Sequence, residues 1–347
     1  MTMAIVRPSL PGGHTDPAAA QVAVNGFRIH VALCRALPDA AAARARALLA
    51  ALSPAARAWA DAHLGGAWRY SEGREALDGA RLDAADREAL RFVVRARQAE
   101  RVCRLALRDA DPDGRVRDWL RDRIPCGRWR AAGEYQALPR PRFPPEEVDR
   151  HARALLSGEG FPANVDPADL VRAAVLAPPS GRVLLVADWS RLHPSILSAL
   201  TGEPIDGDLY TRAGALAGLG RDAGKKLTMG TLYGEGFAAV RAARPDLDER
   251  GVRALARQLR ELRSPGVARL RDRIWRRARR DREIPLPSGH TIRWADGQGP
   301  QHAGAALSWY AMGCESDLLD RAILELDARG VRVVYCVHDS AAVECDA

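Results

Sequence analysis

The residues Val183–Ser190 read VLLVADWS, and Val331–Ser340, near the end of the chain, read VRVVYCVHDS. Each stretch contains an apolar, β-branched run with the length of a buried strand, and each run leads into an aspartate. Asp188 and Asp339 are therefore expected where two strands end, at a place where side chains can converge on an open site. A carboxylate directly after a buried run costs free energy unless it is paired or binds a metal. Two carboxylates brought together by neighbouring strands repel each other unless a divalent cation lies between them, so the pair predicts a metal site.

A helical segment, Gly220–Tyr233, lies between the two aspartates in the sequence. Within it Arg221, Lys225, Met229 and Tyr233 recur every four residues. At about 100° per residue each step drifts by only about 40°, so the four side chains share one slowly winding face. Two cations, a polarisable side chain and an aromatic ring could there bind a triphosphate, a sugar and a base. An ordinary amphipathic helix, with buried leucines and solvated cations, is the alternative. The order carboxylate, cationic helix, carboxylate favours metal-assisted phosphoryl or nucleotidyl transfer.

The composition indicates a folded protein with a modest positive charge. The 347 residues are too many for one ordinary core, so two or three subdomains are expected, and 47% of the residues are hydrophobic. Lys and Arg number 52 against 44 Asp and Glu, and the resulting net charge of +8 leaves nucleic-acid binding open. Lys225 and Lys226 are the only lysines. Because lysine and arginine are not equivalent at a phosphate, this pair favours a phosphate-binding role for the helical segment, and chance retention of two lysines is the alternative.

Cysteine usage and hydropathy exclude several classes of protein. The six cysteines have no CxxC spacing, which predicts buried thiols in a reducing compartment and neither a zinc site nor a disulfide framework. The N-terminus holds no apolar core long enough for a signal peptide, and no stretch approaches a membrane span. We therefore expect an intracellular, cytoplasmic protein that has no membrane partner.

Helical periodicity predicts several long helices. Asp83–Asp109 is the clearest of them in the first third of the chain, because its apolar residues fall on one broad side. Asp39–His63 is rich in alanine and arginine, and its first residue is a predicted N-cap. Asp246–Arg282 is a helical tract with a break near its middle, and Ala303–Gly330 is one long helix that ends at its glycine. The helices of the first third have the composition of a scaffold.

Two basic stretches have the composition of nucleic-acid contacts. Cys126–Pro141 reads CGRWRAAGEYQALPRP, and its glycines and prolines predict a loop. Arg128, Gln136 and Arg140 in this loop offer guanidinium and amide groups to a phosphate backbone and to groove edges. A purely structural loop is the alternative. Arg269–Arg282, which also contains a tryptophan, is basic enough to follow a phosphate backbone, or else forms a solvated charged face.

In chain order, five motifs resemble those of family A DNA polymerases, nearer to the phage- and plasmid-type members than to bacterial DNA polymerase I. Residues 187–197, ADWSRLHPSIL, resemble motif A, ADYSQIExRxL. Residues 221–236, RDAGKKLTMGTLYGEG, resemble motif B, RxxxKxxxxGxxYG, and residues 337–340, VHDS, resemble motif C, VHDE. The loop at 126–141 is similar to TGRWSGRGxQxQNLPRP of the phage-type branch, and residues 286–294, LPSGHTIRW, to its LPSGRxIxY. The motifs stand in the family's order.

The resemblance implies a helix-rich α+β protein with the right-hand polymerase fold, in which a palm with an antiparallel sheet carries a helical thumb and helical fingers. The N-terminus, 1–25, would be loosely ordered, and 26–125 would form a thumb-like helical region. The palm would take 126–205, with the primer-template loop and motif A, and the fingers 206–285, with motif B. Residues 286–347 would return to the palm with motif C, in a form that is short at its C-terminus.

The resemblance also implies the roles of individual residues. Asp188 and Asp339 would be catalytic and would hold two Mg²⁺ ions, with Mn²⁺ as an alternative, and the backbone carbonyl of Trp189 would complete a metal shell. Substrate would be bound by Arg221 and Lys225 at the triphosphate, by His193 near the sugar, and by Met229, Tyr233 and Gly234 near the nascent base pair. DNA would be bound by Arg128 at the minor-groove side of the primer terminus, by His338 at the primer end, and by Gln136 and Arg140.

Several positions depart from the family's pattern. The glutamate of motif A that usually screens the ribose 2′ position is His193, and the glutamate that ends motif C is Ser340. In motif B, where many members have an aromatic residue, the chain has Met229. The family's usual glutamine in the long helix before motif C is Met312, and the asparagine of QNLPRP is Ala137. The sequence ends soon after motif C, where relatives continue, so a fragment or a reduced form is expected.

The function expected from these residues is that of a template-directed DNA polymerase. It would add dNTPs to the 3′ end of a primer on primer-template DNA, as a monomer in the cytoplasm of a bacterial cell or a phage-infected host. The departures leave open a second function, a catalytically weakened polymerase-like protein that binds DNA. A metal-dependent phosphodiesterase or nuclease could use the same two carboxylates, but it would leave the cationic helix without a role.

Overall fold

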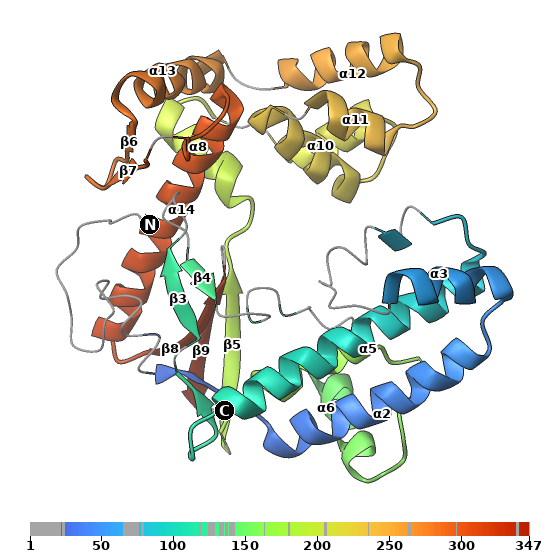
Figure 1. Ribbon diagram of the computed structural model, residues 1–347. Helices are drawn as coiled ribbons and strands as arrows, with labels where there is room; N and C mark the ends of the chain where they lie inside the picture. The colour runs from blue at the N-terminus through green and yellow to red at the C-terminus, as the bar shows by residue number, and fades with distance from the viewer. Residues whose placement is uncertain are drawn as a thin grey trace.

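The computed structural model describes Val22 and residues 25–64, 76–77, 80–117, 119–123, 129–131, 135, 138, 143–162, 164–179, 181–204, 207–234, 236–262, 265–295, 297–337 and 340–346. This part of the chain is a helix-rich α+β protein whose strands form small antiparallel sheets. Figure 1 shows a central sheet with one group of helices beside its lower end and a second group above it. Within the described residues, no helix is both long and apolar enough to cross a membrane.

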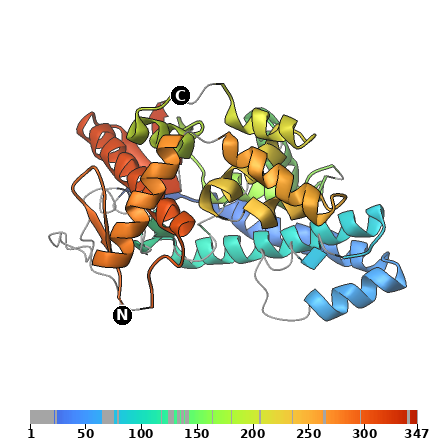
Figure 2. The same ribbon diagram turned by 90° about the horizontal axis from the view of Figure 1, so that it is seen from above.

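The lower group consists of helices from the first half of the chain. They are α2 (Val31–Ala50), α3 (Pro54–Leu64), α5 (Ala84–Asp109), α6 (Pro145–Leu156) and α7 (Pro167–Val175). The predicted helix Asp83–Asp109 is confirmed as α5, and Asp83 caps it by accepting a hydrogen bond from the backbone N–H of Asp86. Helix α5 packs along α2, and Figures 1 and 2 both show the two side by side.

The predicted helix Asp39–His63 is in fact two helices, and its predicted N-cap is wrong. Helix α2 begins eight residues earlier, where the His30 ring nitrogen Nδ1 accepts a hydrogen bond of 3.2 Å from the backbone N–H of Leu33. Asp39 lies inside this helix, directly after Pro38. A proline usually marks the first turn of a helix, so the local pattern placed the start too late. Packing on α5 stabilises α2 on both sides of Pro38, so the helix continues through the proline.

Three strands form the central sheet in the order β5, β9, β8, and all of them are antiparallel to their neighbours. They are β5 (Arg182–Asp188), β8 (Arg332–Val337) and β9 (Ser340–Asp346). The last two strands, β8 and β9, pair with each other in antiparallel fashion. The two strands that lead into Asp188 and Asp339 are not neighbours, contrary to the prediction, because β9 returns between them. Asp188 is opposite Ser340 in the register of β5 and β9.

Strand β5 is also less buried than the sequence predicts. Val183, Leu185 and Val186 are 42%, 61% and 45% exposed. Leu184 is partly buried and packs against the main core. In the described part of the chain β5 hydrogen-bonds to β9 alone, so it is an edge strand. An apolar, β-branched run predicts a strand correctly, but which other elements cover that strand is a property of the tertiary fold.

Small strands and a cluster of aromatic rings join the lower helices to the sheet. The strands pair as β1 (Phe27–Arg28) with β2 (Arg115–Val116) and as β3 (Leu120–Arg123) with β4 (Trp129–Ala131). The Trp119 and Tyr335 rings stack with centroids 4.7 Å apart, and Phe27 meets Tyr135 edge to face at 5.2 Å. Trp119 comes from the first half of the chain and Tyr335 from β8, so these contacts fix the sheet to the lower helices.

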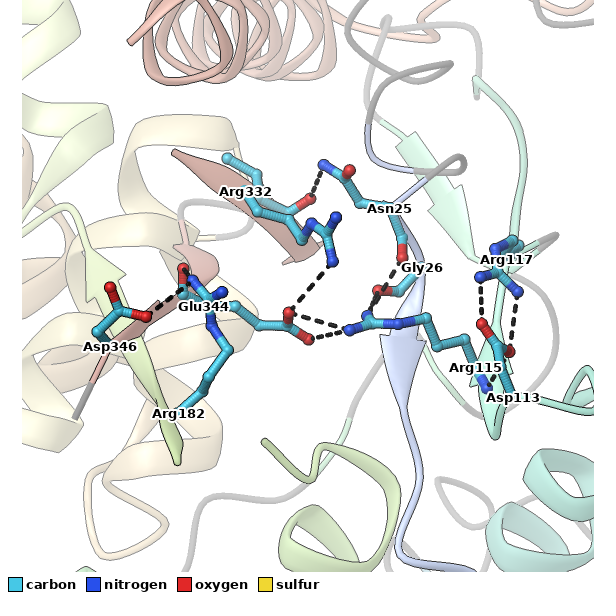
Figure 3. A network of polar contacts seen from close by, with 10 residues as sticks. Asn25, Gly26, Asp113, Arg115, Arg117, Arg182, Arg332, Glu344 and Asp346 are labelled. Atoms are coloured by element: carbon cyan, nitrogen blue, oxygen red, sulfur yellow. Dashed lines mark hydrogen bonds and ion pairs between the residues drawn. The ribbon is translucent and has the colours of Figure 1, made fainter. Parts of the chain in front are cut away.

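A buried ion pair reinforces the same junction (Figure 3). The Arg115 guanidinium donates to both carboxylate oxygens of Glu344, at 2.8 and 3.0 Å, and also to the carbonyl oxygen of Gly26 at 3.0 Å. The side chains of Arg115 and Glu344 are only 11% and 1% exposed. Arg332 lies 3.7 Å from the same carboxylate. A close ion pair with further hydrogen bonds to backbone carbonyls is the form in which a buried charge can be tolerated.

We predict that Arg115→Leu lowers the free energy of unfolding by about 3 kcal/mol, because it leaves the Glu344 carboxylate buried without its main partner. Denaturant unfolding followed by circular dichroism measures this change. The double variant Arg115→Leu with Glu344→Leu is the control, and it should recover most of the loss because no unpaired charge remains. A single variant that is as stable as the wild type would contradict the prediction.

The upper group lies above the sheet and supplies most of the candidate site. Its elements are α8 (Leu192–Thr201), α9 (Leu209–Leu216), α10 (Arg221–Tyr233), α11 (Gly236–Ala243), α12 (Glu249–Glu261), α13 (Pro265–Asp281), β6 (Glu283–Pro285), β7 (Thr291–Arg293) and α14 (Ala303–Ala328). The predicted tract with a central break is confirmed as α12 and α13, and the predicted long helix as α14. Helix α14 runs from this group down to the sheet (Figure 1). A Cβ at Gly224 would collide with the carbonyl oxygen of Tyr210, so α10 and α9 are in backbone contact.

Candidate functional site

The end of β5 opens into a hollow of about 300 Å³ between the central sheet and the upper group of elements. Asp188 is exposed on its rim. Its lining comes from the turn after β5, from the start of α8, and from one face each of α9, α10 and α14: Asp188, Trp189, Ser190, Arg191, Leu192, His193, Tyr210, Arg221, Lys225, Met229 and Glu315. Residues far apart in the sequence therefore share one concave surface.

A tight turn directs the chain from Asp188 into α8. Arg191 has a positive φ of 55°, a left-handed conformation that is uncommon outside glycine and asparagine. Its guanidinium donates to the carbonyl oxygen of Gly207 at 2.9 Å, which ties the turn to the segment that precedes α9. Helix α8 starts at the next residue, so that His193 falls in its first turn and faces the hollow.

Helix α10 brings its two cations to the hollow beside Tyr210. The carbon Cζ of Arg221 lies 5.3 Å from the centroid of the Tyr210 ring, and Nζ of Lys225 lies 6.0 Å from it. Arg221, Lys225 and Met229 all line the hollow, whereas the leucines of α10, Leu227 and Leu232, are 0% and 3% exposed. The helix thus buries its leucines, as an amphipathic helix does, and also presents the predicted cationic face to a cavity.

Asp208 holds the first of these cations in place. The Arg221 nitrogen Nε donates to Oδ2 of Asp208 at 2.6 Å, while Oδ1 of Asp208 accepts from the backbone N–H of Tyr210 at 3.0 Å and caps α9. The hydrogen bond from Arg221 lowers the pKa of Asp208 to about 2. Because a lowered acid pKa keeps the carboxylate charged, the pair persists at neutral pH and is lost only as the pH falls toward that value.

His193 connects three elements at the inner wall of the hollow. Its Nε2 lies 2.7 Å from Oε2 of Glu315, and its Nδ1 lies 2.6 Å from the hydroxyl oxygen of Tyr233. A carboxylate accepts, so Nε2–H is the donor to Glu315, and in the neutral ring Nδ1 accepts from the Tyr233 hydroxyl. The side chains of His193 and Glu315 are 13% and 2% exposed. The rings of His193 and Tyr233 meet edge to face, with centroids 5.7 Å apart.

Sequence reasoning did not identify Glu315 as part of the site. The signal that could have found it is a carboxylate directly after the apolar residues Tyr310–Cys314 of a long helix, because a buried carboxylate requires a partner. The C-terminus of α10 meets the start of the same helix. Gly234 has a φ of 102°, and a Cβ there would lie 3.0 Å from the His302 ring. A Cβ at Gly304 would collide with the carbonyl oxygen of Tyr233, so the two helix ends are in contact.

The structure therefore brings together six of the predicted site residues in one hollow: Asp188, Trp189, His193, Arg221, Lys225 and Met229. Tyr233 joins them through His193, and Gly234 follows at the end of α10. Five other predicted residues lie outside the described part of the chain: Asp339, His338, Arg128, Gln136 and Arg140.

The donors at the rim suit a hard divalent cation. Asp188 offers a carboxylate and Trp189 a backbone carbonyl, both oxygen ligands of the kind that Mg²⁺ prefers. Among the described residues, no three His, Cys, Asp or Glu side chains gather into a metal-binding group. Ser340, which Asp339 directly precedes in the sequence, is opposite Asp188. The residues present thus fit a cation at the rim.

No protein-family model matches this sequence, and no curated protein matches it. Among solved structures, the chain is similar to the POL domain of Pol1 from M. smegmatis in a complex with DNA primer-template and dNTP, with a TM-score of 0.63 and 15% sequence identity. The match covers 95% of this chain and 62% of that chain, so this chain spans less than two thirds of its neighbour. The likeness shows that this chain has a polymerase-like fold.

Proposed function

We propose that the chain is a template-directed DNA polymerase of family A, which adds dNTPs to a primer 3′ end by two-metal nucleotidyl transfer. The observation that carries this proposal is the shared hollow, where the carboxylate at the end of β5 faces the cationic side of α10. A phosphodiesterase would need the carboxylate but not this face. The likeness to a polymerase domain solved with primer-template and dNTP supports the same reaction.

The catalytic end of the hollow would consist of two carboxylates and one carbonyl. Asp188, Asp339 and the backbone carbonyl of Trp189 would hold two Mg²⁺ ions, which when bound supply Lewis-acid stabilisation of charge on the phosphoryl oxygens. The register between Asp188 and Ser340 supports this assignment, because one peptide link separates Asp339 from Ser340.

The inner part of the hollow would bind the incoming nucleotide. Arg221 and Lys225 would neutralise the triphosphate, whose oxygens would displace the Asp208 carboxylate from Arg221. Met229, Tyr233 and Gly234 would lie beside the sugar and the nascent base pair. His193, which Glu315 orients, would hold the Tyr233 hydroxyl and face the sugar. Glu315 would thus act as a positioning residue.

The remaining family roles extend the same proposal to DNA. Arg128, Gln136, Arg140 and His338 would contact the primer-template, and helices α2, α3 and α5 would act as the thumb of a right hand. The three-stranded sheet would belong to the palm and helices α9 to α13 to the fingers. Hydrogen-bonding groups from the loop at 126–141 would position the duplex, because contacts to phosphate and sugar set orientation.

One observation favours a second function, a polymerase-like protein that binds DNA with weakened catalysis. The residue opposite Asp188 in the sheet is Ser340, where the family's motif C has a glutamate, so the sheet presents a hydroxyl at this position. A hydroxyl is a weaker ligand for a hard cation than a carboxylate. Such a protein would bind primer-template and would extend it slowly or not at all.

Primer extension separates the two functions. A labelled primer-template is incubated with the full chain, Mg²⁺ and dNTPs, and binding of the same DNA is measured by fluorescence anisotropy. We expect metal-dependent extension that follows the template sequence. Binding without extension, by a chain that circular dichroism shows to be folded, would overturn the polymerase and support the DNA-binding protein. Neither binding nor extension would overturn both.

We predict that Glu315→Ala raises the KM for dNTP by about tenfold, the effect of one hydrogen bond to a charged group, and leaves the affinity for primer-template unchanged. The physical reason is that His193 loses the acceptor that orients its ring toward Tyr233. Single-nucleotide incorporation at varied dNTP measures KM and kcat separately.

Two variants of similar chemistry control this prediction. Glu315→Gln keeps an oxygen that can accept from Nε2–H and should recover part of the KM. Glu325→Ala removes a carboxylate of the same helix that is exposed and pairs with Arg329, and it should have no effect. Equal KM values for Glu315→Ala and Glu325→Ala would show that Glu315 has no positioning role.

A further inference from the structure

A second hollow, of about 190 Å³, lies between the end of α13 and the chain that leads from β7 to α14. Two tryptophans, Trp275 and Trp294, line it from opposite elements, together with Arg279, Arg282 and Gln301. It shares no lining residue with the hollow at Asp188. Three of these five side chains come from the basic stretch Arg269–Arg282, for which the sequence predicts either phosphate-backbone contacts or a solvated charged face.

Packing against neighbouring residues fixes the rings of Trp275 and Trp294. Trp294 meets Trp309 of α14 edge to face, with centroids 5.6 Å apart and planes at 88°. Gly299 lies against the five-membered ring of the Trp294 indole, where any Cβ would collide with it. Trp275 and Trp294 both pack partly buried against the core that contains Leu307 and Tyr310. The indole surfaces that remain in the hollow are therefore preorganised, which reduces the entropy lost when a flat ligand binds.

Two guanidinium groups flank these rings. The carbon Cζ of Arg279 lies 5.8 Å from the centroid of the Trp275 ring, so charge and aromatic surface face the same space. Arg282 follows α13 with a φ of 55°, the left-handed conformation, and its backbone N–H donates to the carbonyl oxygen of Ala278 at 3.1 Å. This turn places Arg282 at the hollow's edge. Guanidinium groups bind phosphate with fixed geometry and also stack on flat rings.

The position of the hollow links it to the end of α10. Gln301, which lines the hollow, directly precedes His302, whose ring is in contact with Gly234. One residue advances the backbone by about 3.8 Å at most. The hollow therefore lies next to His302, the residue that packs on the Tyr233–Gly234 end of α10. Figure 1 shows α13, β6 and β7 gathered at the same end of the molecule as α8 and the start of α14.

We propose that this hollow binds one unpaired nucleotide of a single-stranded DNA segment. Its base would stack on the indoles of Trp275 and Trp294, Arg279 and Arg282 would contact the phosphates on either side, and the Gln301 amide would reach the base edge. Stacking on tryptophan together with cations along the backbone is the general chemistry of single-strand binding. The site is distinct from the hollow at Asp188 and requires neither metal nor dNTP.

The test measures binding of fluorescently labelled DNA to the full chain by anisotropy, without Mg²⁺ and without dNTP. A hairpin duplex with a single-stranded thymidine overhang is compared with the same hairpin when blunt. We expect Trp275→Leu to weaken binding of the overhang hairpin by at least about fivefold, the loss of one stacked base, and to leave the blunt hairpin unchanged. Trp275→Phe keeps an aromatic face and should retain most of the affinity.

Arg279→Gln tests the phosphate contact, with Arg276→Gln as its matched control. Arg276 is an exposed arginine of the same helix that does not line the hollow, and its Nε donates to the backbone carbonyl of Asp272 at 3.3 Å. Loss of one phosphate contact to a single strand should reduce the slope of log affinity against log salt concentration by about 0.7. We expect this reduction for Arg279→Gln and none for Arg276→Gln.

A direct measurement does not depend on the variants. An overhang that carries 5-iododeoxyuridine is cross-linked to the wild type by light, and the modified peptide is identified by mass spectrometry. Cross-links to the peptides that contain Trp275 or Trp294 would support the site, and cross-links confined to other peptides would overturn it. Equal loss of affinity in the two arginine variants, or binding of dTMP as strong as that of the overhang, would also overturn it. Because no extension is required, failure of the proposed polymerase leaves this test intact.

Discussion

Asp188→Asn is expected to abolish primer extension, with kcat lower by at least about 10³-fold, because the transition state loses one of the carboxylates that hold the metal ions. The side chain is exposed at the end of β5, so the substitution should leave the stability of the fold unchanged. Single-turnover incorporation of one nucleotide at saturating dNTP and Mg²⁺ measures the chemical step. Anisotropy with labelled primer-template measures whether the DNA is still bound.

The matched control is Asp346→Asn at the far end of the same sheet. The Asp346 side chain is 92% exposed and lies 3.7 Å from Arg182. The substitution removes one negative charge from the same sheet, at a residue that does not line the hollow. We expect its extension rate to equal that of the wild type. An Asp188→Asn variant that extends primers within about threefold of the wild-type rate, far less than removal of a group that stabilises the transition state should cause, would rule out Asp188 as a metal ligand.

Lys225→Met is expected to lower kcat/KM for dNTP by about 10²-fold, because one fixed cation at the triphosphate is lost. The side chain is exposed to the hollow, and its ammonium lies 6.0 Å from the centroid of the Tyr210 ring. Methionine keeps most of the length of lysine and its helix propensity, so the change isolates the charge. Titration of dNTP at saturating primer-template measures the effect.

The only other lysine of the chain provides the control. Lys226 is the next residue of α10, is exposed, and does not line the hollow. Lys226→Met removes the same charge from the same helix, so a general loss of attraction for nucleotide or DNA would appear in both variants. We expect kcat/KM to fall in Lys225→Met alone. Equal effects in the two variants would assign the role to net charge and contradict a specific phosphate contact.

Local chemistry explains which parts of the fold the sequence predicts well. The start of α5 is predicted because Asp83 caps it through a bond only three residues away. Helix α14 is predicted because its period persists to a glycine stop, Gly330, whose φ is 74°. The start of α2 was missed because packing on α5 carries the helix through Pro38. The exposure of β5 was missed because burial depends on neighbours that its own residues do not specify.

The same distinction holds at the candidate site. The spacing of Arg221, Lys225 and Met229 on one helix predicts that they share a face, and all three line the hollow. Their partners are not predictable from spacing. His193 meets Glu315 across 122 residues, and Arg115 meets Glu344 across 229. The sequence shows a carboxylate next to apolar residues, which would require a partner if buried, but it does not show which residue that partner is.

For this protein the sequence by itself determined most of the long helices, the cap of α5, and the order of the motifs that supply the aspartates and the cationic helix. These features depend on contacts within a few residues, where periodicity and side-chain chemistry act directly. Only the tertiary structure decided that β9 separates β5 from β8, that Glu315 orients His193, and that two tryptophans enclose a second hollow. These features depend on which distant surfaces are buried against each other, and one chain's apolar pattern is compatible with many such pairings.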